Sequence, residues 1–183
     1  MKKLLLIFTI LISNLSANAQ NQKDTLINPY ENKNEIKLNV PLLAFGMFET
    51  SYERHLNENN SLGITLHTLF DHENEDQDLN YYISPYYRRY FGKKYGSGFF
   101  AEGFSILSSI DGKKITDIEG NLTDRKGPEV FDLSLGIGLG SKWVTKSGFV
   151  FEVHAGLGKQ LFNYEKTDHN QIVKFGINFG YRF

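Results

Sequence analysis

The side chains in this sequence that could do nucleophilic chemistry lie in two alternating stretches near the C-terminus. His154 lies two positions after Glu152, and Ser134 lies two positions after Asp132. A histidine that takes a proton from a serine hydroxyl, while an acidic group orients its ring, is the arrangement of serine hydrolases. A hydroxyl and a histidine within reach are common without such activation. His154, Ser134 and Glu152 are therefore kept as candidates for an alternative function only.

Other common kinds of site have no counterpart in the sequence. The chain has no cysteine, which excludes disulfides, thiolate metal sites and a cysteine nucleophile. His55 and His67 lack metal-ligand spacing, and the acidic stretch 72–78 lacks the glycine and final glutamate of an EF-hand loop. We expect no metal and no cofactor. The 183 residues carry 20 Lys and Arg against 21 Asp and Glu, so no nucleic-acid partner is expected.

The N-terminus has the three parts of a secretory signal peptide. Lys2 and Lys3 precede an apolar stretch from Leu4 to Ile12, and Ala17-Asn18-Ala19 offers small residues for cleavage before Gln20. The apolar stretch is shorter than the roughly 20 residues of a membrane-spanning helix. We predict a signal peptide at 1–19, followed at 20–34 by a polar, asparagine-rich leader that is flexible and, after export, periplasmic.

Alternation with a period of two dominates the rest of the chain. At the C-terminus, apolar residues occupy every odd position from Val173 to Phe183, whereas Lys, Gly, Asn and Arg occupy the even positions. This pattern places the two sets on opposite faces of one strand. The pattern predicts eight strands, at 35–45, 47–57, 61–71, 79–91, 98–109, 130–143, 148–161 and 172–183. The stretch 98–109 is apolar on both faces, so its phase stays open.

The connections between these strands alternate in length. Residues 57–60, 92–97 and 144–147 form short turns rich in Asn, Gly, Lys and Ser, whereas 72–78, 110–129 and 163–171 are longer and polar. Short turns at one end and long loops at the other are typical of outer-membrane barrels. The first outer connection, around Phe45-Gly46-Met47, is too short for a regular scheme. The predicted fold is all-β, an eight-stranded antiparallel transmembrane up-and-down barrel over 35–183.

The choice between a membrane barrel and a soluble one depends on which face points inward. Eight strands leave an interior only just wide enough to be filled by side chains. The bulky apolar set would overfill it, whereas the glycine-rich, charged set fits. We therefore expect the apolar face to contact outer-membrane lipid. In the alternative, a soluble secreted barrel, the aromatic set would line a ligand pocket.

The last strand carries the most specific resemblance to a known family. The segment from Phe175 to Phe183, which reads FGINFGYRF, looks like the C-terminal insertion signal of small barrel-only outer-membrane proteins of the OmpA/OmpX type from Gram-negative bacteria. The resemblance covers 35–183 and suggests an uncharacterised, porin-like subfamily. It implies that the barrel assembly machinery recognises Phe179, Tyr181 and Phe183, with periplasmic chaperones as further partners, and that the protein is a monomer.

The interior charges predict how the barrel is filled. Three cations and three carboxylates are expected toward one end of the interior, and buried charges persist when they are paired. They are Lys37, Glu53, Arg88, Glu102, Glu152 and Arg182. We expect a salt-bridge plug and a structural or surface-interaction role, with the loop 110–129 presented to partners. A narrow channel is one alternative.

The other alternative is an enzyme that modifies lipid, since some eight-stranded barrels act on lipid A. A hairpin closing near residue 145 would place His154 opposite Gly136 and Ser134 one diagonal step away.

Overall fold

The computed structural model describes residues 32–70, 79–116, 122–163 and 171–183. The predicted signal peptide, most of the predicted leader and the acidic stretch 72–78 lie outside these residues. Among the described residues, no helix is long and apolar enough to cross a membrane.

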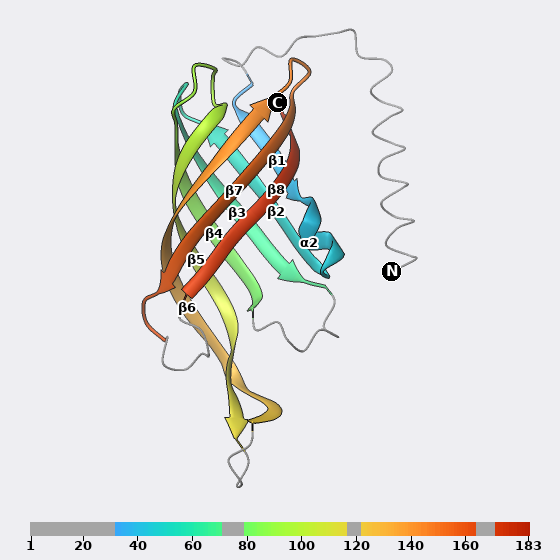
Figure 1. Ribbon diagram of the computed structural model, residues 1–183, viewed down its shortest axis with the longest axis vertical. Coiled ribbons are helices and arrows are strands. Elements are labelled where there is room, and N and C mark those ends of the chain that lie inside the picture. Colours follow the sequence, from blue (N-terminus) through green and yellow to red (C-terminus); the bar gives the residue numbers. More distant parts are fainter. Residues whose placement is uncertain (1–31, 71–78, 117–121, 164–170) are drawn as a thin grey trace.

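Eight antiparallel strands form one closed barrel, which confirms the predicted fold class (Figure 1). Each strand pairs with its neighbours in the sequence, and the first strand pairs with the last. The strands are β1 (Asn34–Asn39), β2 (Met47–His55), β3 (Asn60–Leu69), β4 (Leu79–Tyr90), β5 (Gly98–Thr116), β6 (Leu122–Val144), β7 (Phe149–Gln160) and β8 (Gln171–Arg182). A short helix, α2 (Val40–Ala44), follows β1.

The two faces of the wall differ in chemistry as the alternation predicted. Along β6, Leu135, Ile137 and Leu139 are exposed on the outer surface at 52%, 77% and 55%, while Asp132 and Ser134 are buried inside. The open phase of 98–109 is now assigned, because the buried side chains of β5 include Phe100, Glu102, Phe104 and Ile106, whereas Phe99 and Leu107 are exposed. Every strand therefore turns an apolar face outward.

Glycines of β6 make room for aromatic rings of the neighbouring strand β5, because Gly136 pairs with Phe104 and Gly140 with Phe100. A Cβ atom at Gly136 would lie 2.3 Å from the ring of Phe104, and one at Gly140 would lie 2.4 Å from the ring of Phe100. Phe104 also packs with Tyr82, Tyr86 and Ile106 in a small buried cluster. The predicted glycine-rich inner face is thus covered by aromatic side chains, and these fill much of the interior.

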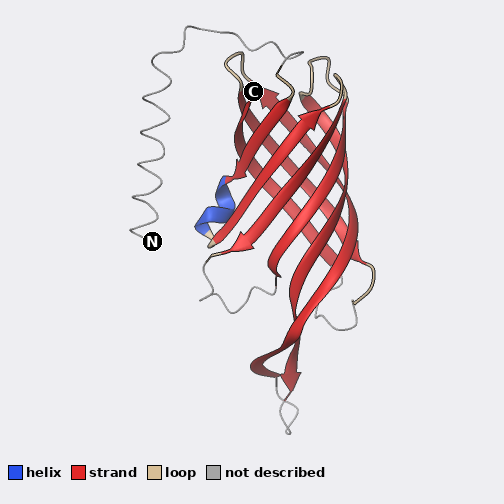
Figure 2. Ribbon diagram, turned by 180° about the vertical axis from the view of Figure 1, so that it is seen from behind, coloured by secondary structure: helices blue, strands red, loops and turns tan. Residues whose placement is uncertain are grey.

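The strands β5 and β6 are longer than predicted, so the expected loop over 110–129 is wrong. The pairing of β4 with β5 ends at Ile110, and that of β6 with β7 begins at Ser134, yet β5 and β6 remain paired as far as Thr116 and Leu122. We call the parts at 111–116 and 122–133 the ribbon. Figures 1 and 2 show it projecting beyond the other strands. Bulges interrupt its pairing after Ile110.

The predicted first strand, 35–45, is also wrong in its second half. The strand ends at Asn39, and α2 takes up the next five residues. Pro41 has no N–H to donate to a neighbouring strand, and its fixed φ suits the first turn of a helix. The alternation Val40, Leu42 continues through this segment and therefore misled the prediction.

Candidate functional site

The interior of the barrel contains a network of buried charges near the end with the short turns. Five cations and four carboxylates take part, and none is more than 4% exposed. We call these residues the charge cluster: Glu35, Lys37, Glu53, Arg88, Glu102, Lys142, Glu152, Lys174 and Arg182. Seven of the eight strands contribute to it, all except β3, because the inward phase of each of the seven carries one or more of these side chains.

Glu53 lies at the centre of the charge cluster. One carboxylate oxygen accepts from Lys37 Nζ at 2.6 Å and from Arg88 Nη1 at 2.9 Å, and the other accepts from Lys142 Nζ at 2.9 Å. The hydroxyls of Ser61 and Tyr90 also donate to Glu53, at 2.7 and 2.5 Å. A buried carboxylate needs this many donors to offset the loss of water.

Arg88 joins three carboxylates across the interior. Its guanidinium donates to Glu53, to Glu102 at 2.5 Å and to Glu152 at 2.7 Å. The guanidinium carbon also lies 4.4 Å from the ring centre of Tyr86 and 4.3 Å from that of Phe100. Two aromatic faces and three carboxylates thus hold one cation, an arrangement that suits the planar, weakly hydrated guanidinium.

Arg182 closes the short-turn end of the network. It donates to Glu35 at 2.5 Å, and to the backbone carbonyls of Tyr95 and Gly96 at 3.1 and 2.8 Å. The β4–β5 turn that carries these carbonyls lies against the inside of the barrel mouth, where the ring centres of His55 and Tyr95 are 5.7 Å apart. One arginine of the last strand therefore fixes both the first strand and a turn across the mouth.

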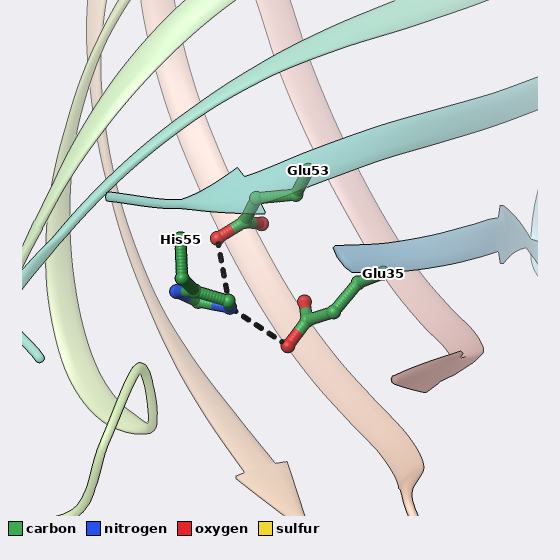
Figure 3. A group of neighbouring side chains, drawn as sticks. All are labelled: Glu35, Glu53 and His55. Atoms are coloured by element: carbon green, nitrogen blue, oxygen red, sulfur yellow. Dashed lines mark hydrogen bonds and ion pairs between the residues drawn. The ribbon is translucent and has the colours of Figure 1, made fainter. Parts of the chain in front are cut away.

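Three of these neighbouring residues have the side chains of a metal site. Donor atoms of Glu35, Glu53 and His55 lie within 4.8 Å of one another (Figure 3). Lys142 Nζ already bonds both carboxylates, at 2.7 and 2.9 Å, and Arg182 bonds Glu35. A metal ion would have to displace both protein cations, so the geometry favours an ion-pair network over a metal centre.

The structure brings five of the six predicted plug residues into direct contact. Lys37 pairs with Glu53 and Glu152, and Arg88 pairs with Glu53, Glu102 and Glu152. The sixth, Arg182, pairs with Glu35, which in turn pairs with Lys37 at 3.9 Å and with Lys142 at 2.7 Å. The sequence reasoning missed Glu35 and Lys142.

The missed residues were present in the alternation. Glu35 shares the inward phase of Lys37, His55 that of Glu53, and Lys142 that of the glycines of β6. They were overlooked because they lie at strand ends, where the boundary between strand and turn is hardest to set.

The residues of the enzyme alternative lie apart. His154 pairs with Gly140 rather than with Gly136, so the predicted register is wrong by four residues. Ser134 pairs with Gln160, six positions away from His154 along β7, which corresponds to roughly 20 Å along the strand. His154 Nδ1 instead lies 3.3 Å from its strand neighbour Glu152. A serine, histidine and acid triad is not assembled from these residues.

The residues of the predicted assembly signal lie on the outside of the last strand. Phe179 and Phe183 are about half exposed, at 51% and 50%, and Tyr181 is half-buried. Phe179 packs against Phe151 with ring centres 5.2 Å apart. The backbone of Phe183 pairs with that of Asn34, which joins the two ends of the barrel wall.

Comparisons with known proteins agree with this geometry. The family described as "Protein of unknown function (DUF3575)" matches residues 5–181. The chain belongs to this family. No curated protein sequence matches it. Among solved structures, it resembles the N-terminal β-barrel domain of Pseudomonas aeruginosa OprF, with a TM-score of 0.54 and 18% identity, over 83% of this chain and 98% of that one. This likeness is one of fold.

Proposed function

We propose that this protein is a monomeric outer-membrane barrel with a closed interior and a structural or surface-interaction role. One observation carries the proposal: the wall turns apolar side chains outward and paired charges inward. A soluble protein rarely exposes an apolar surface as continuous as the outward rows of β6, β7 and β8. A bilayer is the solvent that suits such a surface, and a closed barrel pairs its backbone groups there.

The charge cluster supports the closed interior. Charges that pair with one another and stack on Tyr86, Tyr90 and Phe100 leave little unfilled space between opposite strands. An open pore would keep its charges in water, with fewer direct contacts between opposite signs. We therefore assign the charge cluster the role of a plug that also fixes the register of the strands.

The remaining parts of the proposal concern export, assembly and orientation in the membrane. The signal peptide at 1–19 would direct export, and 20–34 would remain as a periplasmic leader. Phe179, Tyr181 and Phe183 would be read by the barrel assembly machinery after delivery by periplasmic chaperones. The short turns would then face the periplasm, and the ribbon would project from the cell surface toward partners.

Quenching of the single tryptophan tests the membrane placement. Trp143 is 52% exposed on the outer face and stacks on Phe151 with ring centres 5.4 Å apart. Vesicles that contain lipids brominated on their acyl chains should quench its fluorescence strongly, because the outward face of β6 contacts lipid. Fluorescence unaffected by brominated lipid, in a protein that stays in solution, would overturn the proposal.

A further inference from the structure

The barrel wall is incomplete at its β1–β8 seam. The pairing of β8 with β7 begins at Gln171, but its pairing with β1 begins only at Asn178. On the other side, β2 pairs with β3 from Met47 but with β1 only from Thr50. Over this stretch α2 takes the place of a strand and contacts both β2 and β8. Figures 1 and 2 show the helix at this place on the side of the barrel. We call the gap between β8 and β2 that α2 fills the notch.

The segment that fills the notch is suited to lipid. From Val40 to Phe48 there is no charged, hydroxyl or amide side chain. Phe45 and Phe48 are exposed at 56% and 40%, whereas Leu42 is buried at 7%. A connection in water would carry polar turn residues, as the short turns do. With the barrel in a membrane, as proposed above, α2 and the exposed rings that follow it would therefore face the bilayer at the notch.

A row of polar side chains lies directly behind the notch. Asn39, the last residue of β1, donates to Glu49 Oε1 at 2.8 Å, and the hydroxyl of Tyr82 donates to Glu49 Oε2. His67 lies beside Glu49 in the register of β2 and β3, and its ring stacks on Tyr82 with centres 4.7 Å apart. Glu49 and His67 are 4% and 6% exposed.

This row differs from the charge cluster in having no lysine or arginine partner among the described residues. No lysine or arginine of the described residues pairs with Glu49, whereas each carboxylate of the charge cluster has one or more. Neither ring nitrogen of His67 has a hydrogen-bond partner within the described part of the chain; Nδ1 is 3.7 Å from Glu49 Oε2. Buried polar groups are nearly always hydrogen-bonded, and a buried carboxylate is normally paired with a cation. Besides His67, Glu49 has only the neutral donors Asn39 and Tyr82 in the part of the chain that the structure describes, and a donor that carries positive charge would serve both Glu49 and His67.

We propose that the notch admits one amine-bearing lipid from the bilayer. Its acyl chain would lie along α2 beside Leu42, and its ammonium group would reach Glu49 and His67. An ammonium supplies the charge that a lysine or arginine would bring to Glu49, and one of its N–H groups can donate to a ring nitrogen of His67. The proposal rests on the proposed function, because the notch must face lipid.

Photolabelling of the folded protein tests this site. The mature chain is reconstituted in phosphatidylcholine vesicles and irradiated with hexadecylamine that carries a mid-chain diazirine; labelled positions are found by mass spectrometry. We expect saturable labelling in 40–49 and on the inward face of β4 near Tyr82. Hexadecanoic acid with the same diazirine should label these positions about tenfold less, as expected when a charged hydrogen bond is lost.

Two variants and one control define the site. Glu49→Gln and His67→Phe should each lower labelling by hexadecylamine, with about a tenfold loss for Glu49→Gln. His67→Phe keeps a ring that can stack on Tyr82 and so tests the site even where Glu49→Gln does not fold. Asp132→Asn removes another buried carboxylate, 5% exposed on β6, and should leave labelling unchanged.

The outcomes separate the two proposals. Labelling confined to outward-facing residues such as Leu157 and Phe175, or equal labelling in the wild type, Glu49→Gln and His67→Phe, would overturn the lipid site while the membrane barrel stands. A wild-type chain that folds but does not enter vesicles would overturn the proposed function and the lipid site together.

Discussion

Substitution of Glu53 by glutamine should destabilise the barrel more than any conservative change on its surface. Glu53 is fully buried and accepts from three cations: Lys37, Arg88 and Lys142. Glutamine keeps the shape but removes the charge, so these cations keep only their other carboxylate partners. Breaking one side of a buried ion-pair network costs about 3–5 kcal/mol. That is a large part of the 5–15 kcal/mol by which typical domains are stable.

The loss should be measured as the free energy of unfolding in urea. The barrel is reconstituted in vesicles under conditions where unfolding is reversible. Unfolding is followed by the change in Trp143 fluorescence as this side chain leaves the lipid. Glu58→Gln is the matched control, because Glu58 lies exposed in the β2–β3 turn five residues away. The control should change stability by less than about 0.5 kcal/mol.

A second substitution tests whether charge balance is the cause. Lys142→Met removes a cation that contacts Glu53 at 2.9 Å. The double variant with Glu53→Gln should lose about 1–3 kcal/mol less unfolding free energy than the sum of the two single losses, because it leaves fewer unpaired charges. Equal stability of Glu53→Gln and Glu58→Gln would refute the reasoning, since it would mean that the interior charges are hydrated rather than paired.

Three further predictions test the packing, the closed interior and the assembly signal. Gly140→Ala should lower the free energy of unfolding by about 1–3 kcal/mol, because the new methyl group would meet the ring of Phe100 and a backbone carbonyl; Gly103→Ala, with open space around it, should change it little. In planar bilayers the wild type should conduct little, and Arg88→Ala should raise the conductance, since its guanidinium bridges opposite walls; unchanged conductance would argue against the plug. Phe183→Ala should reduce the amount of barrel in cells but not refolding of the purified chain into detergent, and an equal loss in both would assign Phe183 to stability rather than to assembly.

The fold could be predicted from the sequence because the side chains on one face of a strand occupy every second position, and here they share one chemical character. In β7, the exposed Phe151, Val153 and Leu157 alternate with the buried Glu152 and His154, and the structure keeps this division. A shift by one residue would exchange the faces, so the pattern fixes the phase of a strand strongly. The phase in turn placed the charged residues inside.

The pairing of one strand with the next could not be predicted as well. The register depends on the turn, and a shift by an even number of residues leaves the faces unchanged. The β6–β7 turn closes with Gly148 at a φ of +91°, and Thr145 bonds Phe149 across it. The hairpin is therefore centred about two residues later than expected, which moved His154 by four positions relative to β6.

Two other features depend on contacts that a single strand does not reveal. The ribbon forms because β5 and β6 continue to pair beyond Ile110 and Val130, where a polar sequence suggested a loop. The end of β1 at Asn39 depends on Pro41, whose effect was hidden by the surrounding apolar residues. Long-range pairing and local backbone chemistry thus decided the parts that the periodicity left open.

Heat modifiability in the outer-membrane fraction tests the central claim most directly. Cells expressing the chain are fractionated, and the outer-membrane proteins are run on a denaturing gel with and without boiling. A closed barrel in the membrane should migrate at a different position until boiling unfolds it. A protein that is found in the periplasm or medium, and that migrates at the same position with and without boiling, would contradict the account.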